Sequence, residues 1–351
     1  MRRLLRRVHA WTGLAISLLL LSFAVTGGAL VYKEAYWRLV HPELRVSAPV
    51  LGPSDHAAAI AAAWSDFGGR IRSIKLPEPG VPAYHLYLDG GEAFLSATDH
   101  RVIDHWRPDE RVMGFLFDLH AHLMAGEAGE RVGGVIALLA VVLAASGLVL
   151  WWPARRRFAA AHLLPRDLSR RGLLLWHRDL GALASPVLLV LLLTGSGLVF
   201  YNTARTLLNG VLGDAVPVTT PPEGEPGAPF SLPDAAMISR VESAFPGARI
   251  VFYRPPRDGI HEFRLKQPCE LHPNGRSYVY LDAAGSIVQE IDACAMPPGE
   301  RAAQAFYPLH AGKSGSAVYK LVVFLGALAL AGLSLSGALS YLRKLRRPRE
   351  R

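Results

Sequence analysis

Four histidines recur at matched positions in the two halves of this 351-residue chain. His9 and His177 are each followed by a glycine after four residues and by a Thr-Gly pair after 17 and 18 residues. His120 and His310 are each followed by a Ser-Gly pair after 26 and 27 residues. Because the intervals are the same in both halves, the sequence predicts an internal duplication, a common way to build membrane proteins.

Pairs of imidazoles from separate helices are the ligands of a bis-histidine b-type haem, and helix bundles often hold such cofactors. A flat macrocycle also needs small residues on the helices beside it. Eighteen residues of helix span about 27 Å, so each glycine of the Thr-Gly and Ser-Gly pairs falls level with the histidine pair at the far end of its helix. We therefore predict two haem sites. Their ligands are His9 with His177 and His120 with His310; the packing glycines are Gly147 and Gly337 beside the first pair, and Gly27 and Gly195 beside the second.

Other interpretations of these residues remain open from the sequence. A histidine at a membrane interface is often a surface residue, and glycine or serine in a span often serves helix packing. Zinc or copper is disfavoured, because no carboxylate or thiolate cluster accompanies the pairs. His122 is an alternative ligand to His120, although its counterpart in the second copy is Gly312. His162 has no counterpart, and we expect it to be a surface residue.

Basic residues near the two pairs are candidates to bind haem propionates through charge-assisted hydrogen bonds. They are Arg6, Arg7 and Arg178 near the first pair and Arg131 and Lys313 near the second. Arginine near a membrane end is also an ordinary orientation residue, so both roles stay open for each of them.

Four uncharged apolar stretches of 21 to 23 residues can place these histidines in a membrane. A helix of about 20 apolar residues crosses the hydrocarbon core of a bilayer. The stretches are Ala10–Tyr32, Val132–Trp152, Gly181–Tyr201 and Leu321–Leu342. The first is longer than the apolar region of a signal peptide and has a near-copy in mid-chain, so we expect a retained helix. The sequence predicts a bundle of four transmembrane helices.

The net charge of +9 follows the expected membrane topology. The N-terminus, the loop 153–180 and the tail from Arg343 hold 17 basic and three acidic residues, whereas the two long segments hold the other 21 basic and 26 acidic residues. Positive residues concentrate on the cytoplasmic side, so we expect both termini in the cytoplasm and both long segments outside it. The positive charge is thus an orientation signal, and we do not expect nucleic acid as a partner.

Each long segment predicts a small α+β module, with a helix followed by four strands. The helices, 54–67 and 231–245, each begin with a serine that can act as N-cap. The strands are expected at 70–76, 83–89, 92–97, 101–106, 248–253, 261–266, 276–282 and 286–291. The two cysteines, Cys269 and Cys294, lie in the second module, and in an oxidising compartment they most simply form one structural disulfide.

The chain resembles the PepSY-associated transmembrane helix family of bacterial inner-membrane proteins over essentially its whole length. The motifs that carry the resemblance are "VHAWTGL…TGG", "LHAHLMAGEAGERVGG…SGLVLWWP", "WHRDLG" and "LHAGKSG". The outer modules resemble PepSY domains, most clearly in the hairpin "YVYLDAAGSIVQEI"; the corresponding "FLSATDHRVID" of the first module is a weaker match. Members of the family include iron-uptake proteins and ferric-siderophore reductases.

The resemblance implies an oxidoreductase with two b-type haems held by His9, His177, His120 and His310. A cytoplasmic or quinol donor would supply electrons, and an Fe(III)-siderophore in the periplasm would accept them. Trp106, Arg107, Arg254 and Arg257 are candidates to dock the chelate, although module core or surface roles are equally open. The alternative is a membrane scaffold without redox activity whose PepSY domains bind a periplasmic protein or peptide. A transporter is disfavoured because the spans lack charged residues.

These expectations define the domain boundaries. They are 1–32 for the first span, 33–115 for the first periplasmic domain, 116–153 for an outer histidine segment with the second span, 154–176 for a cytoplasmic loop, 177–201 for the third span, 202–304 for the second periplasmic domain, 305–345 for the other histidine segment with the fourth span, and 346–351 for a cytoplasmic tail.

Overall fold

The computed structural model describes residues 1–47, 49–165, 167–213 and 220–345, so the expected tail 346–351 lies outside the described residues. The chain divides into two compact units. The helical unit comprises Met1–Val31, Leu116–Arg205 and Phe306–Arg351, and the sheet unit comprises Tyr32–Phe115 and Thr206–Ala305. The chain therefore enters and leaves each unit more than once.

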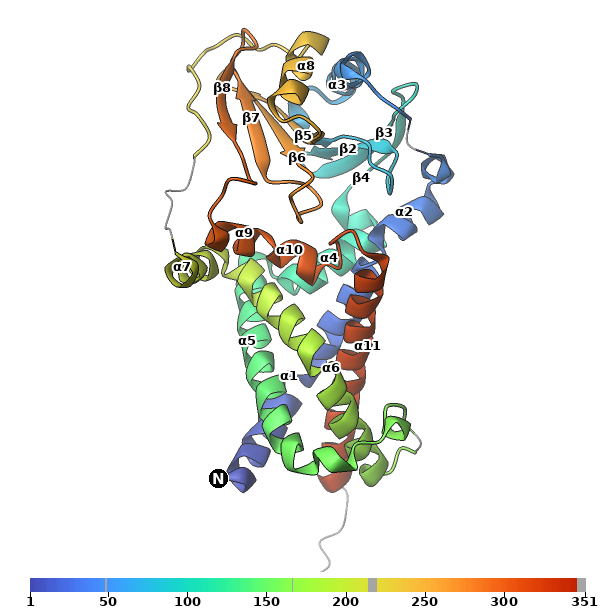
Figure 1. Cartoon of the computed structure of the whole chain (residues 1–351). Helices are drawn as coiled ribbons and strands as arrows, with labels where there is room; N and C mark the ends of the chain where they lie inside the picture. The colour runs from blue at the N-terminus through green and yellow to red at the C-terminus, as the bar shows by residue number, and fades with distance from the viewer. Residues whose placement is uncertain (48, 166, 214–219, 346–351) are drawn as a thin grey trace, which may run out of the picture. The chain divides into compact units, whose positions relative to one another are not determined.

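Four helices in the described part of the chain are long and apolar enough to cross a membrane, in agreement with the four predicted spans. They are α1 (Arg2–Leu30), α5 (Gly126–Trp151), α6 (Arg170–Val199) and α11 (Ala317–Leu345). Helix α1 packs against α11 and α5, and α6 packs against α5 and α11, so the four helices form a closed bundle (Figure 1). Their outward side chains are mostly apolar, as expected for a surface in contact with lipid.

Helix α6 begins seven residues before the predicted start of the third span at 177. Ser169 is its N-cap, and the hydroxyl of Ser169 accepts a hydrogen bond from the backbone N–H of Gly172 at 3.0 Å. A capped amphipathic turn can extend a helix beyond its apolar stretch, which hydropathy alone does not reveal. As a result, His177 lies within α6 and not at its first residue.

Shorter helices connect these elements. Two of them carry the outer histidines, α4 (Val112–His122) and α10 (Phe306–His310). The others are α2 (Lys33–Val40), η1 (Pro42–Arg45), η2 (Gly68–Arg70), η3 (Pro108–Glu110), η4 (Trp152–Arg157), η5 (Ala160–His162), α7 (Tyr201–Leu212) and α9 (Pro298–Gln304).

The sheet unit contains one antiparallel sheet of eight strands in the order β4-β3-β2-β1-β5-β6-β7-β8. The strands are β1 (Ile71–Lys75), β2 (Ala83–Leu88), β3 (Gly91–Ser96), β4 (Val102–Trp106), β5 (Arg249–Arg257), β6 (Ile260–Lys266), β7 (Ser277–Leu281) and β8 (Ile287–Ile291). All eight overlap the strands expected from the sequence. The sequence also predicts two separate domains, whereas the structure joins the two modules by antiparallel pairing of β1 with β5. This pairing covers an edge that each module would otherwise expose.

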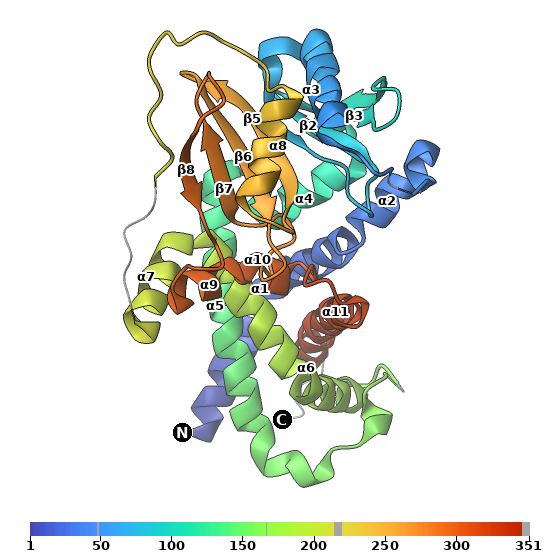
Figure 2. The ribbon, with the colours of Figure 1, turned by 45° about the horizontal axis from the view of Figure 1, so that its top comes forward.

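Helices α3 (Pro53–Phe67) and α8 (Ala235–Ala244) cover one face of this sheet (Figure 2). Ile60 of α3 and Val241 of α8 belong to the same apolar core as residues from both halves of the sheet. The predicted serine caps are wrong. Gly52 is the N-cap of α3, with Pro53 at the first helical position, and Asp234 caps α8 by accepting from the Met237 N–H at 2.7 Å.

Cys269 and Cys294 form a disulfide with a Cα–Cα distance of 6.1 Å. The disulfide closes a loop of 25 residues that includes β7. Glu270, which follows the first cysteine, is buried and accepts hydrogen bonds from the Gln267 N–H and the Ser277 hydroxyl, each at 2.9 Å. The bridge therefore closes a segment that is also ordered by its own polar contacts.

Candidate functional site

The four matched histidines meet as two pairs inside the helical unit. His9 on α1 lies against His177 on α6, with ring centroids 6.3 Å apart. His120 on α4 lies against His310, the last residue of α10, with ring centroids 6.0 Å apart. These are the pairs that the equal spacing in the two halves predicts. We call them the α1–α6 pair and the α4–α10 pair.

Left-handed backbone follows both short helices that carry the α4–α10 pair. Leu123 and Met124 have φ values of 50° and 60° after α4, and Gly312 and Gly315 have φ values of 68° and 86° after α10. Glycine adopts this conformation readily, whereas other residues do so at a cost of about 1–2 kcal/mol each. Both halves of the chain thus reverse direction sharply between the histidine and the following span.

The Nδ1 atoms of the α1–α6 pair are held by polar groups on neighbouring helices. The Nδ1 atom of His9 lies 2.9 Å from the Ser146 hydroxyl on α5. The Nδ1 atom of His177 lies 3.1 Å from both the Leu333 carbonyl oxygen and the Ser336 hydroxyl on α11. Packing of α1 on α5 and of α6 on α11 therefore orients the two rings.

The α4–α10 pair is held in the same way. The Nδ1 atom of His120 lies 3.0 Å from the Thr26 hydroxyl on α1. The Nδ1 atom of His310 lies 2.9 Å from the carbonyl oxygen of Leu191 on α6. Phe23 of α1 also meets the His120 ring edge-on, with centroids 5.8 Å apart.

These contacts define the tautomer of the neutral rings. A carbonyl oxygen can only accept, so His177 and His310 donate from Nδ1. The Ser146 hydroxyl donates to the Leu143 carbonyl at 3.0 Å, and that of Thr26 donates to the Ser22 carbonyl at 2.6 Å. Each hydroxyl oxygen is then available to accept from its histidine. All four rings therefore keep a lone pair on Nε2, and no Nε2 atom has a hydrogen-bond partner among the described residues.

Each predicted glycine lies directly against one of the four imidazoles. The distance from an added Cβ to the Cε1 atom would be 2.7 Å for Gly27 to His120, 2.7 Å for Gly195 to His310, 3.2 Å for Gly337 to His177 and 3.4 Å for Gly147 to His9. Alanine at the first two positions would collide with the ring. The glycines therefore make room for the imidazole rings themselves.

The geometry of both pairs fits a haem iron between the two rings. Metal–imidazole bonds are about 2 Å long, so two rings that ligate one metal from opposite sides have centroids about 6 Å apart. The observed separations are 6.3 and 6.0 Å. Within the described part of the chain, no three His, Cys, Asp or Glu side chains come together as a metal site. A b-type haem has this arrangement, because the protein supplies two ligands to the iron and the porphyrin supplies the others.

The electrostatics of the α4–α10 pair also favour ligation. Burial lowers the pKa of His120 to about 4, and the neighbouring His310 acts in the same direction, while a hydrogen bond from the imidazole to the Phe23 backbone carbonyl opposes it. Burial likewise lowers the pKa of His310. Metals bind neutral imidazole, so both rings are in the ligating form at neutral pH.

Apolar side chains fill the bundle between the two pairs. Gly27, which contacts His120, lies 18 residues beyond His9 on α1, or about 27 Å along the helix. Ile16 and Leu20 of α1 pack there against Ile136 and Ala140 of α5. The two candidate sites therefore lie near opposite ends of one bundle and are separated by a medium of low dielectric.

The hydroxyl residues that hold the rings were not predicted from the sequence. Thr26, Ser146 and Ser336 each contact a histidine, and each directly precedes one of the four predicted glycines. The signal was therefore present in the Thr-Gly and Ser-Gly pairs, of which only the glycine was given a role. A small residue followed by glycine opens one face of a helix to a neighbouring ring.

His122 does not lie against the other histidines. Its Nδ1 atom contacts Oδ1 of Asp118 at 2.8 Å, one turn earlier on α4, and its ring lies beside Phe117. Residues three and four apart share a helix face, so His120 and His122 point in different directions. The structure thus brings His120 to His310.

The basic residues considered for propionates are placed differently from one another. Arg6 and Arg7 are exposed on the first turns of α1. Arg131 is exposed and pairs with Glu127 at 3.1 Å, and Arg178 is already bound to Asp179. Arg6 and Arg7 therefore remain candidates, whereas Arg178 would have to leave a carboxylate.

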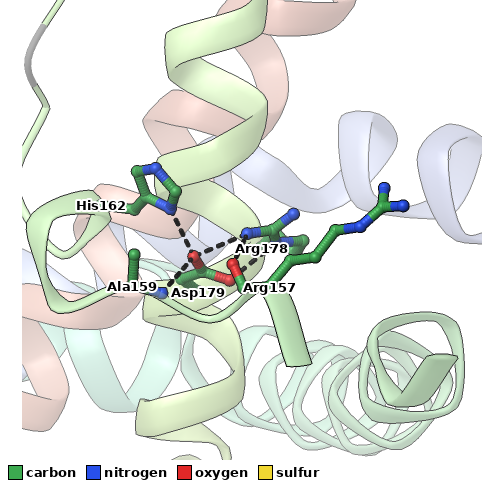
Figure 3. A network of polar contacts seen from close by, with 5 residues as sticks. All are labelled: Arg157, Ala159, His162, Arg178 and Asp179. Carbon is green, nitrogen blue, oxygen red and sulfur yellow. Dashed lines mark hydrogen bonds and ion pairs between the residues drawn. The ribbon is translucent and has the colours of Figure 1, made fainter. Parts of the chain in front are cut away.

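A buried carboxylate anchors the loop between α5 and α6 (Figure 3). Asp179 of α6 is 0% exposed and accepts from both guanidinium Nε and Nη2 of Arg178, at 2.7 and 2.8 Å. Its Oδ2 atom also contacts Nδ1 of His162 at 2.7 Å, and Arg178 donates to the Arg157 carbonyl at 2.9 Å. His162, expected at the surface, is only 24% exposed, because Asp179, 17 residues further along the chain, holds its ring.

The Asp179→Ala variant is expected to release this loop. Removing one partner of a fully buried ion pair costs roughly 3–5 kcal/mol. Since the side chains of Arg178 and His162 are each 24% exposed, water can replace part of the interaction, and we expect a loss of about 2 kcal/mol. Thermal unfolding of the detergent-solubilised protein and proteolysis within 153–169 measure it. Glu127→Ala is the control, because it removes an ion pair with Arg131 in which the Glu127 side chain is 86% exposed. It should change neither the unfolding temperature nor the rate of proteolysis. The same result for both variants would contradict the anchoring role of Asp179.

The candidate docking residues of the sheet unit do not gather into one site. Trp106 is 3% exposed and packs against Trp37 and Phe94, so it belongs to the core. Arg107 pairs with Asp109, and Arg254 pairs with Glu262. A chelate-binding role for Trp106 is therefore excluded by its burial.

Comparison with known proteins agrees with this architecture. No curated protein matches the chain. The family described as PepSY-associated TM region matches residues 6–344, which includes both histidine pairs, the four spans and the intervening sheet segments. The chain is therefore a member of the PepSY-associated TM region family.

Proposed function

We propose that this protein is a di-haem b electron carrier of the bacterial inner membrane that reduces an Fe(III)-siderophore in the periplasm and thereby releases Fe(II). The observation that carries the proposal is the geometry of the two imidazole pairs. In each pair the ring centroids lie 6.0 to 6.3 Å apart, which is the separation expected for two imidazoles that bind one metal. The Nδ1 atoms of all four rings have polar partners, and their Nε2 atoms have none among the described residues. Surface or packing histidines have no need of this arrangement.

Haem bound at these sites would supply one-electron Fe(III)/Fe(II) chemistry. The chain's own residues have three tasks. The four histidines hold the metal centres, the helix packing fixes the ring orientations, and the apolar side chains between the pairs exclude water. No nucleophile or general acid is needed for this reaction, because the chemistry consists of electron transfer.

The charge distribution supports one orientation of the protein in the membrane. The 17 basic residues of the N-terminus, the α5–α6 loop and the tail favour the cytoplasm. The α1–α6 pair would then face the cytoplasmic or quinol donor, and the sheet unit would be periplasmic. The disulfide between Cys269 and Cys294 fits an oxidising compartment.

The periplasmic substrate follows from the chemistry of iron chelates. Siderophores bind ferric iron far more tightly than ferrous iron, so a single electron is enough to weaken the complex. A carrier that spans the membrane can deliver that electron without importing the chelate. The sheet unit would provide the docking surface.

The visible spectrum of the purified protein tests the proposal. Protein expressed with ample haem supply should show a Soret band that shifts on dithionite reduction, with about two haems per chain by the pyridine haemochromogen assay. Reduced protein should be reoxidised by an Fe(III)-siderophore, with Fe(II) trapped by a ferrous chelator. A colourless preparation would instead favour a scaffold that binds a periplasmic protein or peptide.

A further inference from the structure

The Nδ1 partners of the four histidines differ between the two halves of the chain. In the first half, the Thr26 and Ser146 side-chain hydroxyls contact the two Nδ1 atoms, and the backbone carbonyl of Phe23 also accepts a hydrogen bond from His120. In the second half, backbone carbonyls contact both rings, from Leu191 for His310 and from Leu333 for His177. The duplicated sequence conceals this difference, because Thr194 and Ser336 occupy the positions of Thr26 and Ser146.

Thr194 shows the difference most clearly. Its hydroxyl donates to the carbonyls of Val190 and Leu191 on its own helix, at 2.6 and 3.2 Å. No hydrogen bond joins Thr194 to His310, whose Nδ1 atom binds the Leu191 carbonyl directly. Thr26 is its counterpart in sequence, yet it contacts its histidine through its side chain.

The neighbouring glycines explain how a backbone carbonyl becomes accessible. A helical side chain covers the turn that precedes its own Cα, so a glycine leaves the carbonyl four residues earlier uncovered. Gly195 stands four residues after Leu191, and Gly337 stands four residues after Leu333. Both glycines contact the ring that uses the carbonyl. Gly27 and Gly147 have the same spacing from Phe23 and Leu143, so the two halves differ in their hydroxyl contacts and not in their glycines.

We propose that Thr26 and Ser146 are positioning residues that fix His120 and His9 with Nε2 directed to haem iron, while backbone carbonyls do this for His310 and His177. This inference rests on the proposed haem function. Each haem then has a first-half ligand held by a hydroxyl and a second-half ligand held by a backbone carbonyl, to which the Ser336 hydroxyl is added at His177. A side-chain substitution should therefore alter the first-half ligand more than the second-half ligand, because His310 has no hydroxyl partner and His177 keeps the Leu333 carbonyl when the Ser336 hydroxyl is lost.

Loss of such a hydrogen bond has a defined electronic effect. A ring that donates from Nδ1 is a more basic ligand, and loss of the acceptor typically lowers metal affinity roughly 10- to 100-fold. A more basic ligand favours the ferric state. Removing the acceptor should therefore raise the midpoint potential of that haem and leave the other haem unchanged.

Thr26→Val and Thr194→Val form the matched test at the α4–α10 pair. Both threonines are buried, 3% and 6% exposed, and valine has nearly the same shape. We expect Thr26→Val to raise one midpoint potential and to weaken retention of one haem, whereas Thr194→Val changes neither. Thr26→Ser restores the hydroxyl and should restore both properties.

Ser146→Ala and Ser336→Ala form the corresponding test at the α1–α6 pair. Ser146 is the Nδ1 partner of His9, whereas His177 keeps the Leu333 carbonyl when the Ser336 hydroxyl is removed. The shift in potential should therefore be larger for Ser146→Ala. If Thr26→Val does not fold, the comparison of Ser146→Ala with Ser336→Ala still tests the positioning role.

The readouts, all on the detergent-solubilised full chain, are haem content, redox titration and thermal unfolding. Equal potentials and haem retention in Thr26→Val and Thr194→Val, with haem present at two per chain, would overturn the positioning role and leave the haem proposal intact. Failure of Thr26→Ser to restore the potential would also overturn it. Wild-type protein without haem would overturn the proposed function, and this inference with it.

Discussion

His310→Ala should yield protein with about one haem per chain instead of two. The substitution removes one of two imidazoles from the α4–α10 pair, and the remaining His120 cannot hold the iron from both sides. The α1–α6 pair lies near the other end of the bundle, about 27 Å away along α1, and should keep its haem. Haem per protein, measured by the pyridine haemochromogen assay, gives the result, and His9→Ala should remove the other haem.

His122→Ala is the control for this experiment, because it removes a histidine of α4 that contacts Asp118 and no other histidine. It should keep both haems. Full haem content in both His310→Ala and His9→Ala would show that the ligand assignment is wrong, even for a protein that contains haem. Loss of one haem in His122→Ala and of none in His120→Ala would assign the ligand role to His122 in place of His120.

Gly195→Ala and Gly27→Ala should damage the same site by adding a single methyl group. The new Cβ would lie 2.7 Å from Cε1 of the ring in each case, which is too close for a carbon contact. The imidazole or the helix must move, and such overpacking costs about 1–3 kcal/mol. Because the ring is also displaced from its Nδ1 partner, we expect weaker retention of one haem together with a lower unfolding temperature.

The helices provide a graded set of controls for the glycine variants. Gly147→Ala places its Cβ 3.4 Å from His9, and Gly13→Ala places it 3.9 Å from the Leu143 side chain. We expect a small effect at Gly147 and none at Gly13. An equal loss of haem in Gly13→Ala and Gly195→Ala would mean that alanine perturbs helix packing in general and not the histidine site.

Hydropathy and spacing were sufficient to predict much of the helical unit. A transmembrane span needs a long uncharged stretch, so its presence is a local property of the chain. The equal intervals after the four histidines then suggested the pairs, since residues at equal intervals on two helices lie at the same depth. The histidines meet in the pairs that the spacing suggests, whereas the four glycines, expected to pack beside haem, lie against the imidazole rings. The role of these residues at a haem stays a prediction.

Other features could not be predicted because they depend on partners distant in sequence. The joining of the two modules through β1 and β5 depends on an edge that only the folded modules present. Asp179 and His162 are 17 residues apart, and no local pattern links them. The burial of Trp106 likewise follows from Trp37 and Phe94, which come from other elements of the sheet unit.

By itself, the sequence determined the four spans, the eight strands, the family and which histidines share the same intervals, because each of these depends on local composition or on spacing along the chain. The tertiary structure decided which atom holds each ring. Thr26 and Thr194 are identical in type and position within their repeats, yet only Thr26 contacts a histidine. A hydrogen bond requires two atoms within about 3 Å, and small differences in helix packing between the two halves decide whether a hydroxyl or a carbonyl reaches that distance.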